Sequence, residues 1–98
     1  MEVCYKNNKL RKECTDASVS ERSYGFDMAV LIFQRIEEIQ ASPTVEFMIE
    51  HRIGRCHPLK FDRKGQYAVD LVHPFRLVFQ KQGSEIQIAR IIEITDYH

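Results

Sequence analysis

The sequence has few of the features that mark membrane, secreted or disulfide-built proteins. No stretch approaches the ~20 consecutive apolar residues of a transmembrane helix. The first residues, 1–6, are not followed by the apolar segment of a signal peptide. The three cysteines are odd in number and irregularly spaced, which argues against a disulfide framework and for a reducing compartment. We therefore expect a cytoplasmic protein with no membrane segment.

Several signatures of catalysis and ligand binding are missing as well. The chain has no glycine-rich phosphate loop, no supportable Ser-His-Asp arrangement, no repeat and no linker. Cys56 beside His57 hints at metal ligation, but no CxxC or HxxxH pair accompanies them, so we expect no metal and no cofactor. The 98 residues have an ordinary globular composition and predict a single domain over 1–98.

The charge that is present is unevenly distributed. The net charge is zero, yet residues 51–81 carry seven Lys or Arg against two Asp or Glu, while residues 1–50 carry six against nine. A local basic surface of this kind attracts phosphates even when the whole chain is neutral. A solvated face of scattered cations is the alternative explanation.

The N-terminal half begins with a predicted strand and continues with helices. Val3–Tyr5 is the strand, and 7–14 could form one or two helical turns. Ser18 and Glu21 have the spacing of a capping box. A helical apolar face then recurs to about Ile39: Phe26, Ala29, Val30, Phe33 and Ile36.

A second helix start is predicted at Ser42, because Pro43 then occupies the first helical position, where no N–H is needed. Val45, Met48 and Ile49 would line one side of that helix until about residue 51.

The periodicity changes to two after residue 54, which indicates strands. Residues 67–71 and 75–79 alternate apolar and polar side chains around a turn at 73–74. The last strand, 86–94, places Arg90 among isoleucines, so the sequence predicts either a bulge near Ala89 or an edge position for Arg90.

This order of elements predicts an α+β fold. An N-terminal strand and two to three helices would pack on one face of an antiparallel-rich sheet of four to five strands. If Phe75, Leu77 and Phe79 face the helices, then Arg76 lies on the other face, with Val78 and Gln80.

RNA carries its own nucleophile, and this chain contains the groups needed to activate it. A base must take the proton of the 2′-hydroxyl, an acid must protonate the leaving 5′-oxygen, and a cation must stabilise the phosphorane. His57 is one candidate proton carrier, because histidine titrates near neutrality. Arg76 and Lys60 are the candidate phosphate cations. Taken alone, each has a structural explanation as a turn histidine or a solvent-side cation.

The C-terminal residues Asp96, Tyr97 and His98 supply the second group of candidates. Chain ends usually fray, but a strand inside a sheet can deliver them to a fixed place. His98 is the second proton carrier, Asp96 could orient a histidine or act as a base, and Tyr97 could stack on a base or handle a proton. Their order of action as acid and base stays open.

The chain resembles the HigB branch of the RelE-like toxin superfamily over essentially its whole length. The resemblance rests on His57-Pro58-Leu59-Lys60-x-Asp62-Arg63-x-Gly65, on an arginine inside strand 75–79, and on the terminal Asp96-Tyr97-His98. It departs from the family at Phe61, where glycine is common, and in its zero net charge.

The resemblance implies a toxin of a type II toxin–antitoxin pair that enters the ribosomal A site and cleaves the mRNA being translated. The implied partners are the ribosome with its 16S rRNA, the mRNA, and a helix-turn-helix (HigA-like) antitoxin. The implied catalytic set comprises His57, Arg76, Asp96, Tyr97 and His98. The implied phosphate- and RNA-binding cations are Lys60, Arg63, Lys64 and Arg55.

Two alternatives remain on the same fold. One is a non-catalytic inhibitor such as a gyrase-binding toxin, which would not need His57 or residues 96–98. The other is an inactive module that only binds its antitoxin.

Overall fold

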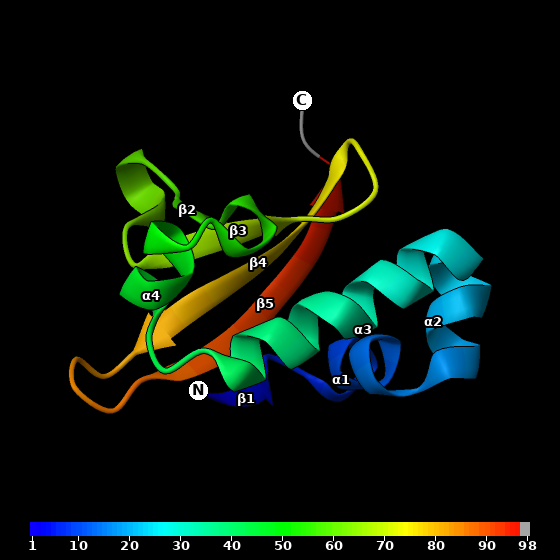
Figure 1. The fold of residues 1–98 in the computed structure, drawn as a ribbon. Coiled ribbons are helices and arrows are strands. Elements are labelled where there is room, and N and C mark those ends of the chain that lie inside the picture. Colours follow the sequence, from blue (N-terminus) through cyan, green and yellow to red (C-terminus); the bar gives the residue numbers. More distant parts are fainter. Residues whose placement is uncertain (97–98) are drawn as a thin grey trace.

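A five-stranded mixed sheet organises the chain in the computed structural model, which describes residues 1–96. The strands lie in the order β1-β5-β4-β3-β2 (Figure 1). β1 runs parallel to β5, and the other neighbours are antiparallel. The strands are β1 (Glu2–Tyr5), β2 (His57–Pro58), β3 (Gln66–Asp70), β4 (Phe75–Gln82) and β5 (Ile88–Asp96). This arrangement confirms the predicted α+β class with an N-terminal strand.

The described residues form four α-helices, one more than the upper limit predicted. They are α1 (Asn8–Thr15), α2 (Ala17–Tyr24), α3 (Phe26–Ala41) and α4 (Val45–Glu50). Two short 3₁₀ helices follow, η1 (Ile53–Arg55) and η2 (Phe61–Arg63). None of the helices within residues 1–96 has the length and apolarity that crossing a bilayer requires.

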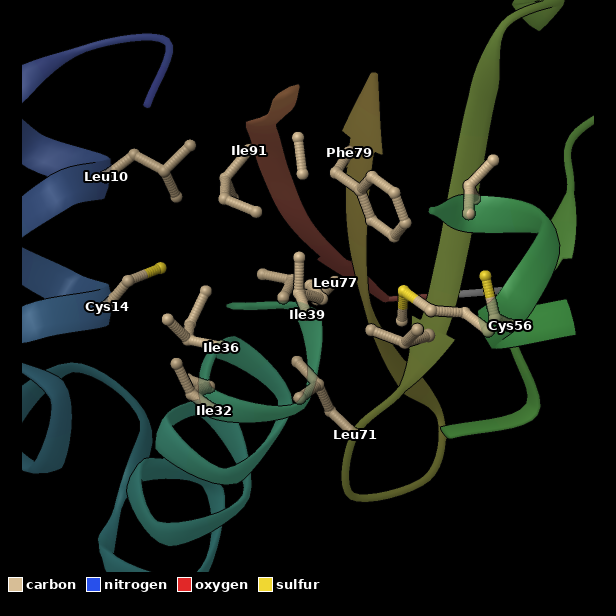
Figure 2. Close-up of a cluster of buried hydrophobic side chains, with 14 of the residues drawn as sticks. Leu10, Cys14, Ile32, Ile36, Ile39, Cys56, Leu71, Leu77, Phe79 and Ile91 are labelled. Atoms are coloured by element: carbon tan, nitrogen blue, oxygen red, sulfur yellow. The ribbon is translucent and has the colours of Figure 1, made fainter. Parts of the chain in front are cut away.

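The core lies between the helices and one face of the sheet. Leu10 and Cys14 of α1 and Ile36 of α3 pack toward Ile91 of β5 and Phe79 of β4 (Figure 2). Alternation along β4 places both Leu77 and Phe79 on this face, and neither is exposed to solvent. The helices therefore cover one face of the sheet and leave the other available for a site.

The predicted helical caps and the predicted face of the long helix were wrong in detail. Asp16, not Ser18, caps α2, because its extended backbone lets the carboxylate accept hydrogen bonds from two amide groups of the first turn. Thr44, not Ser42, caps α4. In α3, Phe26 and Val30 are 65% and 49% exposed. Ala29 and Ile36 are buried as predicted, but the helix is rotated so that the rest of its buried face consists of Met28, Ile32 and Ile39.

The rotation of α3 relative to its predicted apolar face has a simple cause. Apolar residues occupy more than one helical face of this segment, so periodicity alone cannot choose between them. The choice is made by packing on β1 and α1, which α3 contacts. In α4, Val45 and Met48 are buried as predicted, whereas Ile49 is 38% exposed.

The bulge in the last strand lies three residues beyond its predicted place. Val78 pairs with Glu93, but the next residue, Phe79, pairs with Ile91, so Ile92 is the extra residue. Arg90 does not lie at the sheet edge, because it pairs with residues of both β1 and β4. The bulge returns Glu93 to the face of the sheet opposite the helices.

Candidate active site

The open face of the sheet carries one row of side chains from four strands. His57 pairs with Ala68, Ala68 with Val78, and Val78 with Glu93. Residues directly opposite one another in antiparallel strands point to the same face. Since Leu77 and Phe79 point into the core, Val78 and its row point away from it.

A pocket of about 450 Å³ opens on this face, and we call it the His57 pocket. It lies between β2, the segment that follows β2, β4, and the C-terminal end of β5. Its lining consists of His57, Pro58, Leu59, Lys60, Phe61, Arg63, Arg76, Val78, Thr95 and Asp96. Five residues that the sequence singled out for chemistry thus surround one cavity: His57, Lys60, Arg63, Arg76 and Asp96.

The hydrogen bond of His57 determines the chemistry of its ring. Its Nδ1 lies 2.9 Å from the backbone carbonyl oxygen of Arg55. A carbonyl oxygen only accepts, so Nδ1 must carry the hydrogen. The neutral ring therefore has its lone pair on Nε2, which can take a proton from a substrate.

The loop that supplies this carbonyl has an unusual backbone. Arg52, Gly54 and Arg55 all have positive φ angles, of 54°, 58° and 53°. Side-chain-bearing residues rarely adopt this left-handed conformation, which concentrates at functional sites and costs of order 1 kcal/mol or more per residue. Arg55 is also tied to β3, because its Nε donates to the Asp70 carboxylate at 2.6 Å. These features hold the Arg55 carbonyl oxygen at hydrogen-bonding distance from His57 Nδ1.

Arg63 lies at the pocket with its guanidinium already engaged. It forms an ion pair with Glu93, which lies on the open face of the sheet, and its Nε donates to Gln66 Oε1 at 2.7 Å. Glu93 therefore offsets part of the positive charge of Arg63. Lys60 also lines the pocket and is exposed, and Arg76 is half-buried. Among residues 1–96, Lys60 and Arg76 are thus the other two cations that line the pocket.

The remaining predicted residues do not line the His57 pocket or are not described. Lys64 is exposed just after η2, and Arg55 lines two adjoining hollows instead. Tyr97 and His98 lie outside the described residues. The roles predicted for all of these side chains remain predictions.

Cys56 does not belong to the reactive groups. It is 5% exposed in the core, and burial raises the pKa of its thiol to about 12. Cys4, Cys14 and Cys56 are all free thiols. Over residues 1–96, no cluster of three or more His, Cys, Asp or Glu side chains is placed to hold a metal ion.

Sequence reasoning missed three residues around the pocket. Thr95 and Phe61 line it, and Glu93 neutralises Arg63 beside it. A signal for Glu93 was present, since a lone carboxylate interrupts the isoleucine-rich last strand. The alternation suggests a bulge in this strand but does not place it at Ile92, and that position sets the face of Glu93.

Comparisons with known proteins find the same fold in solved structures. No protein-family model matches the sequence, and no curated protein matches it. A solved structure described as a YoeB/ParE toxin from Agrobacterium tumefaciens superposes with a TM-score of 0.68, covering 100% of both chains at 17% identity. The chain has the RelE-like toxin fold. A YoeB dimer from Staphylococcus aureus superposes with a TM-score of 0.57, over 100% of this chain and 97% of that one, at 16% identity.

Proposed function

We propose that this chain is a toxin of a type II toxin–antitoxin pair that cleaves mRNA on the ribosome, without a metal. One observation carries the proposal. A histidine with its lone pair held on Nε2 lines the same open pocket as Lys60 and Arg76, on the sheet face that the helices leave uncovered. The fold supports the proposal, because one superposed structure is described as a YoeB/ParE toxin and the other as a YoeB dimer.

The pocket groups suit an attack by the 2′-hydroxyl of RNA. His57 Nε2 takes the proton of that hydroxyl as the 2′-oxygen bonds to phosphorus. Arg76 and Lys60 stabilise the negative charge that builds on the phosphorane oxygens. The bond from phosphorus to the 5′-oxygen then breaks, and that oxygen takes a proton from an acid supplied by residues 96–98. The products are a 2′,3′-cyclic phosphate and a 5′-hydroxyl.

The proposal includes the setting in which the chain acts. We infer a cytoplasmic toxin whose partners are mRNA, the A site of the ribosome with its 16S rRNA, and a helix-turn-helix antitoxin of the HigA type. The excess of cations in residues 51–81 supports contact with RNA, since phosphates are its dominant surface charge. The HigB branch and the single domain over 1–98 belong to this proposal as well.

Purified components test the chemistry. Ribosomes programmed with a defined mRNA are incubated with the protein in Mg²⁺, which keeps the ribosome assembled. In a parallel series Co(NH₃)₆³⁺ replaces part of the Mg²⁺, because this inert complex offers no coordination site to a reacting phosphate. A third series uses free mRNA in excess EDTA as the control without ribosomes. We expect cleavage that leaves a 2′,3′-cyclic phosphate. An mRNA with one 2′-deoxynucleotide before the cleaved bond should resist at that bond only, because it lacks the nucleophile.

Three results would overturn the proposal. Cleavage that persists at the 2′-deoxy position would show that the 2′-hydroxyl is not the nucleophile. Intact mRNA, together with DNA breaks after expression in cells, would instead favour the gyrase-binding alternative. Intact mRNA and intact DNA would favour an inactive module that binds its antitoxin.

A further inference from the structure

Phe61 is the most exposed large apolar side chain of the described residues, and it stands at the His57 pocket. Its side chain is 94% exposed, so it contributes almost nothing to the core. Phenylalanine gains stability in a fold by burying its ring. Folding alone therefore does not account for a phenylalanine at this position.

The backbone of Phe61 is unfavourable as well. Its φ angle is +61°, in the left-handed region that glycine enters freely and that bulky residues avoid. A glycine at this position would remove both the exposed ring and the backbone strain. An exposed apolar ring and a strained backbone thus coincide at one residue. This combination is typical of a side chain that is kept for binding.

The surroundings of Phe61 indicate what it binds. Lys60 precedes it and Arg63 follows it in η2, and all three line the pocket with His57. An exposed aromatic ring among cations is the usual means by which proteins hold single-stranded RNA, since the ring stacks on a base and the cations contact phosphates.

Other exposed apolar side chains of residues 1–96 lack this setting. Ile86 is 89% exposed but lies in the loop between β4 and β5, at the far end of these strands from Arg76 and Asp96. Phe26 is 65% exposed on α3, which packs on the opposite face of the sheet. Neither lines the His57 pocket.

We propose that the ring of Phe61 stacks on a base of the mRNA next to the phosphate that is cleaved. This inference rests on the proposed function, and it adds a residue that biases which codons are cut. Because purines offer a larger stacking surface than pyrimidines, the stacked position should favour purines modestly.

Fluorescence of a stacked base provides the test. Ribosomes are programmed with an mRNA whose A-site codon carries 2-aminopurine, with 2′-O-methyl groups that block cleavage. Binding and quenching are measured for the full chain and for Phe61→Trp, Phe61→Leu, Phe61→Gly and Ile86→Ala. The tryptophan variant keeps an aromatic ring, the leucine variant keeps only apolar bulk, and Ile86→Ala removes an equally exposed side chain elsewhere.

We expect quenching with the natural chain, Phe61→Trp and Ile86→Ala. Phe61→Gly should lose the quenching and bind about 5- to 150-fold more weakly, the range that corresponds to the loss of one base–aromatic stack. Phe61→Leu should also lose the quenching. The glycine variant is expected to fold, since it relieves the left-handed backbone.

Each other outcome overturns the inference. If Phe61→Gly or Phe61→Leu quenches and binds like the natural chain while uncleaved ribosome complexes still form, stacking by Phe61 is wrong and the proposed nuclease stands. If the natural chain neither binds these ribosomes nor cleaves the matching mRNA that lacks the 2′-O-methyl groups, the nuclease proposal fails together with the inference.

Discussion

The Nδ1 of His57 lies 2.9 Å from the backbone carbonyl oxygen of Arg55, and this contact fixes the hydrogen on Nδ1 of the neutral ring. The lone pair is thereby assigned to Nε2. Because the acceptor is a backbone atom, no substitution of the Arg55 side chain removes it directly. His57 is thus prepared as a proton acceptor before any RNA binds.

Replacing His57 should stop catalysis while leaving the fold in place. His57→Ala removes the proposed base, so we expect cleavage of mRNA on programmed ribosomes to slow by about 10²- to 10⁴-fold, the usual contribution of general base catalysis. The side chain is half-buried on the open face, outside the core, so circular dichroism and the unfolding midpoint should change little. His51→Ala is the matched control, since His51 is exposed at the end of α4. Unaltered cleavage by folded His57→Ala would contradict the assignment.

Arg76 should be needed for its charge and for its planar, forked donors. Arg76→Ala should lower the single-turnover rate about 10²-fold or more, in the range seen when one transition-state donor is removed. Arg76→Lys should recover part of this loss, because lysine keeps the charge but not the fork. Arg90→Ala is the control, since Arg90 lies in the same sheet but outside the pocket. Equal rates for the Arg76 and Arg90 variants would show that Arg76 does not contact the reacting phosphate.

The backbone of Phe61 predicts an unusual effect on stability. Phe61→Gly and Phe61→Ala both remove the exposed ring, but only glycine adopts the φ of +61° without strain. The glycine variant should therefore be more stable than the alanine variant by about 1 kcal/mol, which corresponds to roughly 5 °C in Tm. Urea and thermal unfolding measure the difference. An alanine variant as stable as the glycine variant would mean that the left-handed conformation is not kept in solution.

Removing the carboxylate of Glu93 should strengthen contact with RNA. Glu93→Gln releases Arg63 from its ion pair and adds one positive charge to the pocket. Affinity for programmed ribosomes should rise, and its dependence on salt should steepen by about 0.7 to 0.9 if Arg63 gains one phosphate contact. Glu85→Gln makes the same charge change in the exposed loop before β5 and should leave the slope unaltered. Identical slopes for both variants would argue that Arg63 makes no phosphate contact.

Stability should fall in alkaline solution. Burial raises the pKa of the Cys14 and Cys56 thiols from 9.0 to about 12, and that of the Tyr5 and Tyr24 hydroxyls from 10.0 to about 12. The unfolded chain ionises at the lower values and so binds fewer protons than the folded chain in this range. Stability is therefore complete below about pH 9 and declines as the pH rises toward about 12.

Urea unfolding at pH 8, 9.5 and 10.5 measures this decline. Cys56→Ala should have a shallower decline than the natural chain, although it is less stable at pH 8 because it leaves a cavity. A buried valine is the control position: Val45→Ala also leaves a cavity but removes no ionisable group, so it should leave the slope unchanged. A midpoint that stays constant to pH 10.5 would contradict the burial of these groups.

The elements of this fold were largely predictable because strong periodicities mark them. Alternation in residues 67–71 and 75–79 matched β3 and β4, and it placed Arg76 on the face opposite Leu77. The rotation of α3 and the exact position of the bulge, at Ile92 rather than near Ala89, could not be predicted, since both depend on packing against elements distant in sequence. Capping was misjudged at Ser18 because Asp16, two residues earlier, offers a carboxylate in the same role.

The site was predictable in its members but not in its electrostatics. A histidine followed three residues later by a lysine, and an arginine in a strand, can be read from the sequence. The sequence does not reveal that Glu93 forms an ion pair with Arg63, or that the Arg55 carbonyl determines the tautomer of His57. Both depend on strand register, and in β5 the register shifts at a single extra residue.

The most direct test of the nuclease account maps transcript ends after induced expression, with translation running and with initiation blocked. The account predicts new 5′-hydroxyl ends within coding regions when translation runs, none when it is blocked, and none with His57→Ala in either condition. New ends at equal frequency in translated and untranslated RNA, or an unchanged pattern with His57→Ala, would contradict it.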